Sequence, residues 1–308
     1  MSDGLTTAQA IEAARYNDAR ALDLLVMLRS FFGVDQQESK RTYTEALVQR
    51  IAWFQRRFDL SVDGKIGPTT HPLILEQLGA ADAGPLWPAE DAPPEARLAH
   101  YTMLCKLVGH DPAGSRTTLL GLRGVRLFGL RTHIVRSRSE YDDAFVLLRF
   151  QGDEKVYEFR GATHPYQTTS KASPDADGDG RPDVGMLRPG HYHVEALADH
   201  YKGHPALVVL RPSGANRGRL PAYRDTNHDG LFDEAEMRAS ETATSGGQVS
   251  EGMGAWMDQV LFHPGLGFSS IGCQTARSED IRKLHALGKF EYLLVNAVDV
   301  LALMKQMR

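Results

Sequence analysis

Cys273 and His263 are two residues whose types and spacing could support nucleophilic catalysis. A cysteine attacks a carbonyl as its thiolate, and a nearby imidazole can take the thiol proton. His263 ends the apolar segment 260–262, and Cys273 follows a glycine-rich connection, so a returning loop can bring the two side chains together. We also expect a helix soon after Cys273, and its N-terminal partial charge would favour the thiolate. The pattern therefore predicts a cysteine nucleophile with a histidine base.

Two neighbours of the cysteine fit the same interpretation. Gly272 allows the backbone to approach a substrate carbonyl, and the N–H groups of Gly272 and Cys273 could form an oxyanion hole. The alternative is that Cys273 is a small buried hydrophobe and His263 a structural histidine. The Ser-x-Gly-Cys spacing that begins at Ser270, together with the upstream histidine, favours catalysis over that alternative.

Segment 262–275 (FHPGLGFSSIGCQT) resembles the catalytic motif of the L,D-transpeptidase family, a histidine followed by a loop and then Ser/Thr-His-Gly-Cys. The match implies that His263 is the catalytic histidine. It also implies that Ser270, Gly272 and Cys273 take the places of the family's serine, glycine and nucleophilic cysteine. The family's catalytic domain is rich in β-strands, which suits the second part of this chain.

The resemblance implies an acyl-enzyme mechanism on peptidoglycan stem peptides, with no cofactor required. The Cys273 thiolate would attack the carbonyl of an L-to-D amide, and His263 would protonate the leaving D-amino acid. Transfer of the thioester to an amine would be transpeptidation. Transfer to water would be L,D-carboxypeptidase or endopeptidase action with the same residues.

The segment also departs from the family pattern. Ile271 stands where the family usually has a second histidine, and Gln274 and Thr275 replace the usual residues after the cysteine. The loop between the catalytic histidine and cysteine is shorter than usual. These departures keep open a non-catalytic cell-wall-binding protein in which the cysteine is vestigial.

Further polar residues are candidates for lining a substrate cleft. Tyr192, His193 and Arg224 are assigned this role. His191 and His193 share one face of an expected strand, an arrangement that can line a pocket or bind a metal. No third ligand follows at a spacing typical of zinc sites, which favours the pocket.

Two acidic loops match the calcium-loop pattern in full or in part. In loop 225–236, oxygen ligands fall at positions one, three, five, nine and twelve, with glycine at six. These ligands are Asp225, Asn227, Asp229, Asp233 and Glu236. Loop 175–183 is an incomplete version, and an Asx-rich turn would need the same residue types in either loop. We expect any calcium to be structural, with no part in the thiol reaction.

The N-terminal region resembles the peptidoglycan-binding-like family of small three-helix modules. The similarity rests on the end of an expected helix, 48–55 (VQRIAWFQ), and the following segment 60–70 (LSVDGKIGPTT). It extends over about residues 7–78. Glycines permit a tight turn, Pro68 stiffens it, and a threonine caps the next helix. The alternative is a helical packing module without a ligand.

Hydrophobic periodicity supplies the elements that position these motifs. Helices are expected near 7–32, 44–58, 72–78, 95–107 and 278–287, with a strand, a helix or both from 290 onward. Strands are expected at 119–130, 145–150, 155–160, 191–196, 206–210, 219–223 and 259–262. The prediction is a multidomain chain. A small all-α three-helix module (1–80) is followed by a linker and connecting helix (81–115) and a mostly-β L,D-transpeptidase-like catalytic domain with peripheral helices (116–308).

Composition limits the partners and the compartment. The net charge of −4 argues against a nucleic-acid surface, and the apolar stretches are too short for membrane insertion. Two cysteines form at most one disulfide bond, which cannot stabilise a fold of 308 residues, and Cys105 is expected to fill the core. No secretory signal is visible at the start of the sequence. We expect action in the periplasm or cell wall after delivery by a non-standard route, as for a secretion-system effector or an endolysin. The oligomeric state is left open.

Overall fold

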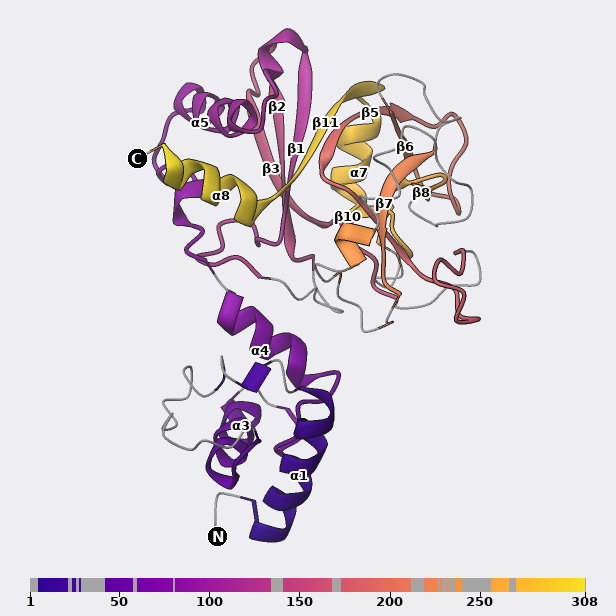
Figure 1. The fold of residues 1–308 in the computed structure, drawn as a ribbon. Coiled ribbons are helices and arrows are strands. Elements are labelled where there is room, and N and C mark those ends of the chain that lie inside the picture. Colours follow the sequence, from indigo (N-terminus) through magenta and orange to yellow (C-terminus); the bar gives the residue numbers. More distant parts are fainter. Residues whose placement is uncertain are drawn as a thin grey trace. The chain divides into compact units, whose positions relative to one another are not determined.

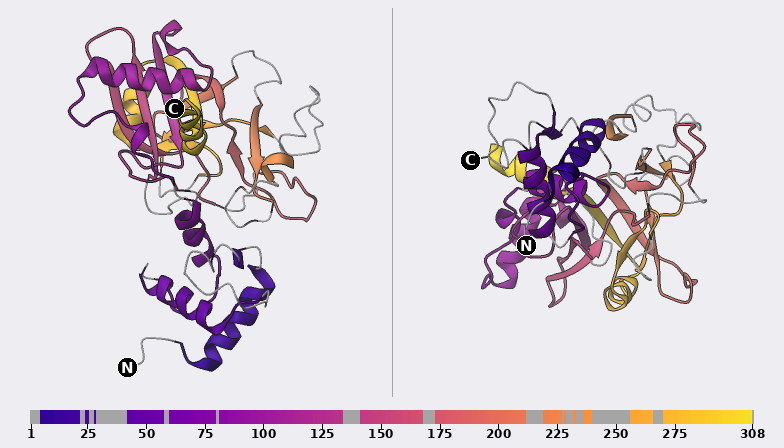
Figure 2. Two further views of the ribbon diagram at one scale, coloured as in Figure 1. Left: turned by 60° about the vertical axis from the view of Figure 1, so that its left-hand side comes forward. Right: turned by 90° about the horizontal axis from the view of Figure 1, so that it is seen from below.

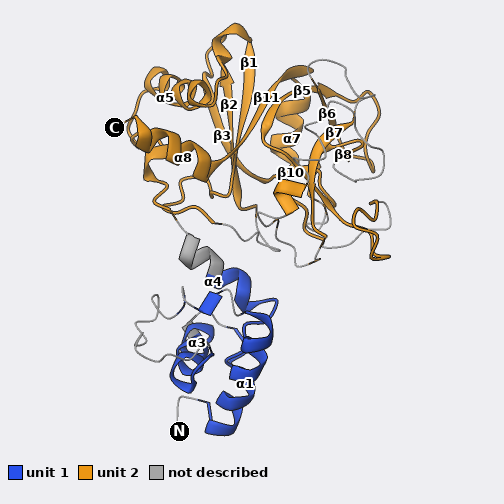
Figure 3. Ribbon diagram, viewed as in Figure 1, with its two compact units in different colours: residues 1–80 blue, residues 81–308 orange. Residues whose placement is uncertain are grey.

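The computed structural model divides the chain into two compact units, residues 1–80 and 81–308 (Figures 1 and 3). The residues that it describes are 5–21, 24, 25, 28, 42–57, 60–79, 81–133, 141–167, 173–211, 219–226, 228, 232, 236–239, 256–265 and 270–307. None of the described helices combines the length and the apolar character that a bilayer-spanning segment requires.

Unit 1, residues 1–80, is helical as predicted. Its helices are α1 (Thr7–Arg20), α3 (Glu45–Arg57) and α4 (Thr70–Gly79). Thr6 caps α1 in a capping box, in which its hydroxyl accepts from the Gln9 N–H and the Gln9 side chain accepts from the Thr6 N–H. The expected first helix, 7–32, is shorter in the structure, because the backbone leaves the helical region at Ala21 (φ −134°).

The turn between α3 and α4 is built on two buried side-chain amides. Gln55, at 1% exposure, accepts from the N–H groups of Asp63 and Gly64 and donates to the Thr70 hydroxyl. Asn17 on α1 donates to the Gly64 carbonyl (2.9 Å). Gly64 has φ +69°, and a Cβ there would lie 2.7 Å from side chains of the core. The turn therefore explains why Gln55, Gly64 and Thr70 stand at these positions of the motif.

Unit 2, residues 81–308, is built around eight strands that close into a barrel (Figure 1). In barrel order these are β1 (Thr117–Arg123), β11 (Lys289–Asn296), β5 (Gly190–Ala196), β6 (Leu207–Leu210), β9 (Leu261–Pro264), β10 (Gln274–Ala276), β3 (Val156–Ala162) and β2 (Asp143–Arg149). A separate sheet contains β4 (Gly185–Leu187), β7 (Leu220–Arg224) and β8 (Trp256–Met257). The β-rich prediction for this part of the chain is confirmed.

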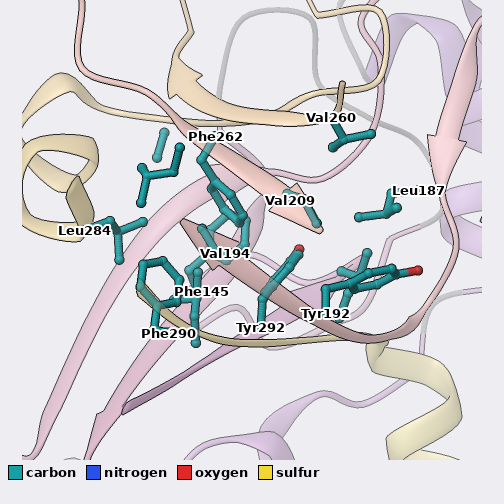
Figure 4. Close-up of a cluster of buried hydrophobic side chains, with 14 of the residues drawn as sticks. Phe145, Leu187, Tyr192, Val194, Val209, Val260, Phe262, Leu284, Phe290 and Tyr292 are labelled. Atoms are coloured by element: carbon teal, nitrogen blue, oxygen red, sulfur yellow. The ribbon is translucent and has the colours of Figure 1, made fainter. Parts of the chain in front are cut away.

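Aromatic residues from several strands fill the inside of the barrel (Figure 4). The Phe262 ring lies 5.0 Å from the Tyr292 ring and 5.7 Å from the Phe145 ring, between centroids. Helix α7 (Ser278–His285) adds Ile281 and Leu284 to this core. Burial of these large side chains stabilises the closed sheet.

A second core lies on the outer face of β1, β2 and β11. Helices α5 (Pro94–Leu107) and α8 (Ala297–Gln306) cover it (Figures 1 and 2). Cys105 is fully buried here, in the filling role expected for it. The expected linker and connecting helix, 81–115, belong to unit 2, because Asp82 bridges to Arg131 and α5 packs on the barrel.

Candidate functional site

Ser270, Gly272 and Cys273 form a tight turn that leads into β10. The Ser270 hydroxyl donates to the Cys273 carbonyl (2.8 Å) and accepts from the Gly272 N–H (3.1 Å). The Tyr166 N–H donates to the Ser270 carbonyl (2.9 Å), which ties the turn to the chain after β3. Ser270 is thus a positioning residue that fixes the backbone around the thiol. The structure also corrects one expectation: β10 follows Cys273 directly, and α7 begins only at Ser278, so α7 does not begin at the thiol.

Gly272 is the point of closest approach between this turn and the smaller sheet. Its φ is +135°, and a Cβ there would lie 2.2 Å from Met257 Cε and 2.5 Å from the Gly185 carbonyl oxygen. Real Cβ atoms are not found so close to other atoms, so glycine is required here. Strands β4 and β8 therefore form a wall against the turn that carries Cys273.

His263 lies on β9, and Cys273 directly precedes β10, the parallel neighbour of β9. In the register of β9 and β10, Phe262 is opposite Gln274, and His263 is opposite Thr275. Since Phe262 points into the barrel core, His263 and Thr275 point outward. Cys273 lies two residues before Thr275. Its thiol is hydrogen-bonded by the main chain of Leu261, as the register predicts.

No hydrogen bond joins the two side chains among the described residues. Catalytic hydrogen bonds are often long before substrate binds, so the lack of a direct bond in the free protein is compatible with proton transfer in a complex. His263 Nδ1 lies 2.8 Å from the Pro264 carbonyl oxygen. A carbonyl oxygen only accepts, so Nδ1 carries the hydrogen, and Nε2 keeps the lone pair that a base needs.

The protonation of this pair follows from its surroundings. Burial lowers the pKa of His263, and the charge of Lys202 lowers it further, whereas the hydrogen bond to the Pro264 carbonyl raises it. Burial raises the pKa of Cys273, whereas the hydrogen bond with the main chain of Leu261 and the charge of Lys202 lower it. These shifts favour a neutral imidazole and a protonated thiol at rest, and a neutral imidazole suits a base that deprotonates the thiol on attack. The thiol of Cys105 is different: burial raises its pKa to about 12.

Lys202 is a site residue that the sequence reading missed. It occupies a two-residue turn in which Tyr201 and His204 exchange backbone hydrogen bonds of 2.9 and 3.0 Å. Lys202 (φ +49°) and Gly203 (φ +80°) both have positive φ, as type I′ turns require. The Tyr201 ring lies 5.0 Å from the His263 ring, and the Lys202 ammonium lies 5.1 Å from the centre of the Tyr201 ring. The Lys-Gly pair between polar residues was its one available sequence signal.

Arg224 lies beside the wall of the site. Its guanidinium donates to the carbonyls of Asp183 and Trp256, and its Nη1 would lie 2.8 Å from a Cβ on Gly185. Burial lowers the pKa of Arg224 to about 10, although the carboxylate of Asp183 opposes the shift. In the structure, Arg224 holds β4 and β8 together next to Gly272.

The structure places the other two expected cleft residues elsewhere. Tyr192 is 3% exposed inside the barrel core, and its hydroxyl donates to the Arg188 carbonyl (2.6 Å; Figure 4). His193 faces outward and its Nδ1 lies 2.8 Å from a Glu291 carboxylate oxygen. It is on β5, three strands around the barrel from β10, which is on the order of 14 Å from Cys273. The assignment of Tyr192 and His193 to the cleft is therefore corrected, because one is buried and the other distant.

The acidic loop 225–236 is described only in part. Asp225 is buried, and Glu236 accepts from the Thr226 N–H (2.7 Å) and hydroxyl (3.1 Å), so the carboxylate closes the loop on itself. The remaining expected calcium ligands, Asn227, Asp229 and Asp233, lie outside the described residues.

Two described clusters have a geometry that could hold a metal ion. One is Asp142, Asp143 and His164. Here Asp143 already accepts from the Thr163 N–H and hydroxyl, the Gly124 N–H and His164 Nδ1, at 2.7–3.1 Å. Burial opposes ionisation of Asp143, but the charge and hydrogen bond of His164 hold its pKa well below the usual range. Asp143 is thus held by four hydrogen bonds at the ends of β1, β2 and β3, while His164 Nε2 lies 3.5 Å from Asp142 Oδ1. The other cluster is Asp175, Asp177 and Asp183.

Comparison with known protein families identifies one region of the chain. Residues 26–72 match the family model described as "Putative peptidoglycan binding domain". This span lies in unit 1 and includes α3 and the turn at Gly64, so the resemblance found there is confirmed over a shorter range than 7–78. Searches of curated proteins and of solved structures found no match. Unit 1 therefore carries a peptidoglycan-binding domain.

Proposed function

We propose that this chain is a peptidoglycan-acting cysteine enzyme of the L,D-transpeptidase type, held on its polymeric substrate by unit 1. The observation that carries the proposal is the pairing of β9, which holds His263, with β10, which begins directly after Cys273, with His263 Nδ1 bonded to Pro264. A peptidoglycan-binding domain in the same chain gives this pair a substrate class. The site of action is then the periplasm or cell wall.

In the proposed reaction, His263 Nε2 takes the Cys273 thiol proton as the sulfur attacks the carbonyl of an L-to-D amide. A C–S bond forms, the C–N bond breaks, and His263 returns the proton to the leaving amine. The N–H groups at Gly272 and Cys273 are the candidate donors to the oxyanion, although Gly272 N–H now donates to Ser270. An amine or a water molecule then attacks the thioester and regenerates the thiol.

Hydrolysis is the second candidate, because water can replace the amine without any change in the site residues. The product distinguishes the two activities. Transpeptidation joins the acyl group to an acceptor amine, whereas L,D-carboxypeptidase action only removes a D-residue. A non-catalytic cell-wall-binding protein is the third candidate, favoured by Ile271 at the position of the family's second histidine.

The test is incubation of the full chain with purified muropeptides, followed by mass spectrometry of the products. We expect a product from the wild type and from Cys105→Ala, and none from Cys273→Ala. Loss of a D-residue without gain of an acceptor would assign hydrolysis. Absence of any product from the wild type would contradict both enzyme proposals.

Wall binding is tested separately by cosedimentation of the full chain with insoluble peptidoglycan. Trp53 on α3 is 53% exposed, an unusual position for an indole, and such rings are enriched at binding surfaces. We expect Trp53→Ala to reduce the bound fraction, with the exposed Arg56→Ala as a control on the same helix. Equal binding by wild type and Trp53→Ala would exclude this face of α3 as the contact surface.

A further inference from the structure

The two acidic loops are joined to the wall of the site. Loop 175–183 ends at Asp183, two residues before β4 begins at Gly185, and Asp225 directly follows β7. Gly185 and Arg224 are register partners, and the Asp225 N–H donates to the Val184 carbonyl (3.2 Å). Both loops therefore emerge at the same end of the β4–β7 pair, next to the residues that contact Gly272.

Three carboxylates of the first loop converge on one point. Oxygen atoms of Asp175, Asp177 and Asp183 lie within 4.8 Å of one another. Asp175 and Asp177 are exposed, whereas Asp183 is fully buried. Like charges at this separation repel, and the repulsion is most costly for the buried member, which has lost its hydration.

Asp183 also presents a buried oxygen without a hydrogen-bond donor. Its Oδ2 accepts from the Ala176 N–H (2.6 Å), but its Oδ1 has no hydrogen-bond partner. His228 Nε2 of the second loop lies 3.4 Å from Oδ1 and 3.7 Å from an Asp179 oxygen. A buried carboxylate oxygen that receives no hydrogen bond, in a residue that belongs to a carboxylate cluster, is the arrangement that a bound cation would complete.

We propose that Asp175, Asp177 and Asp183 bind one calcium ion, and that this ion holds β4 against the turn that carries Cys273. Carboxylate oxygens without sulfur or committed imidazole ligands suit a hard cation, and an adaptable loop suits calcium over the strict octahedron of magnesium. The site is distinct from the sequence-predicted ligand set of loop 225–236. His228 links the two loops through its contacts with Asp183 and Asp179.

The link to the nucleophile runs through a short, packed path. Asp183 anchors the chain two residues before Gly185, and the Gly185 carbonyl oxygen occupies the space beside Gly272. The Asp183 carbonyl also accepts from Arg224 Nη1 (3.1 Å). Loss of the ion would leave the Asp183 charge uncompensated and loosen this wall. An effect of this loosening on catalysis rests on the proposed function, whereas the binding of the ion does not depend on it.

The first test is calcium titration by calorimetry of the full chain, stripped with chelator and desalted. We expect saturable binding in the wild type and a rise in Tm with calcium, because the ion binds the folded state. Asp177→Asn replaces an exposed charged ligand with a neutral, weaker amide oxygen without disturbing the core, and we expect at least a tenfold loss of affinity at one site. Asp153→Asn, an exposed acid in another turn, is the matched control and should bind as the wild type does.

Three results would overturn the ion site. The first is no saturable binding by the wild type up to about 1 mM calcium, the weak end of protein calcium sites. The second is equal binding by Asp177→Asn and the wild type, which would place any calcium elsewhere. The third is preferential binding of zinc over calcium. Cys273→Ala should bind calcium normally, so these results are independent of the proposed enzyme activity.

The second test measures coupling to the site by alkylation with iodoacetamide and peptide mapping. In chelator we expect Cys273 to react a few times faster than in calcium, because the wall beside it is looser. Cys105, buried in the other core, is the internal control and should react at the same rate in both. Equal rates for Cys273 in calcium and chelator would contradict the coupling of the ion to the turn.

Discussion

Gly272→Ala is the substitution for which the structure gives the sharpest expectation. The glycine adopts φ +135°, and an added methyl group would meet Met257 Cε at 2.2 Å and the Gly185 carbonyl oxygen at 2.5 Å. The methionine can move, since its side chain is flexible. The carbonyl cannot move without displacing β4. The substitution must therefore distort either the wall or the turn that carries Cys273.

The magnitude follows from two costs. A side chain at a sparsely populated φ costs about 1–3 kcal/mol, and overpacking a close contact costs about 1–3 kcal/mol more. The free energy of unfolding should fall by about 2–6 kcal/mol. In a unit of this size each kcal/mol lowers Tm by about 2–4 °C, so the decrease should be on the order of 10 °C.

Gly288→Ala is the matched control. Gly288 also has positive φ (+76°), but a Cβ there would meet no atom within 4 Å. It should incur only the conformational cost, about 1–2 kcal/mol. The assay is thermal unfolding by calorimetry, with the alkylation rate of Cys273 as a second readout. Equal Tm values for Gly272→Ala and Gly288→Ala, with unchanged Cys273 reactivity, would refute the close approach of wall and turn.

Three further substitutions test other parts of the account. Ser270→Ala removes two hydrogen bonds of the turn, so we expect the free energy of unfolding to fall by about 1–3 kcal/mol and the alkylation rate of Cys273 to change. Calorimetry and peptide mapping measure these two effects, and the absence of both would show that Ser270 does not hold the turn. Lys202→Gln removes a charge that lowers the pKa of Cys273, so the pH profile of Cys273 alkylation should move to higher pH. Lys305→Gln, at an exposed position, is the control and should leave this profile unchanged. Identical profiles for Lys202→Gln and the wild type would exclude Lys202 from the site. Gln55→Ala leaves buried backbone groups of its turn without partners, so calorimetry should show unit 1 unfolding at lower temperature and unit 2 unchanged, and a single unaltered transition would contradict that role.

The pH dependence of stability gives a signed expectation for His263. Burial lowers its folded-state pKa below the ordinary value of 6.5. The unfolded chain then binds more protons between the two pKa values, so stability rises with pH through this window. His263 should contribute full stability above about pH 6.5 and lose it as the pH falls. His263→Gln should flatten this part of a Tm-against-pH curve, and an unchanged slope would contradict the assignment.

Much of the fold was predictable because its elements carry long periodic patterns. The strands near 145–150 and 191–196 were located to within a few residues, as was the helix that became α5, whereas the strand expected at 119–130 ends at Arg123 in β1. Strands β4, β8 and β10 were missed, since two or three residues leave no measurable alternation. The helix expected at 278–287 is present as α7, but the missed β10 separates it from the cysteine.

The candidate site was predictable only where residues are close in sequence. Ser270, Gly272 and Cys273 form one turn, as their spacing indicated. Tyr192 was misplaced because alternation shows that neighbouring residues face opposite sides, but not which side faces the core. Lys202 reaches the site through the pairing of β6 with β9, which brings the connection between β5 and β6 beside His263. Such long-range placement has no local signal.

Mass spectrometry of a trapped acyl-enzyme tests the central claim most directly. The full chain is incubated with muropeptides, quenched in acid to preserve thioesters, digested and mapped. We predict a stem-peptide adduct on Cys273, none on Cys105, and loss of the adduct in His263→Ala. A wild-type chain that binds peptidoglycan and turns over no muropeptide, with Cys273 unmodified throughout, would contradict the account.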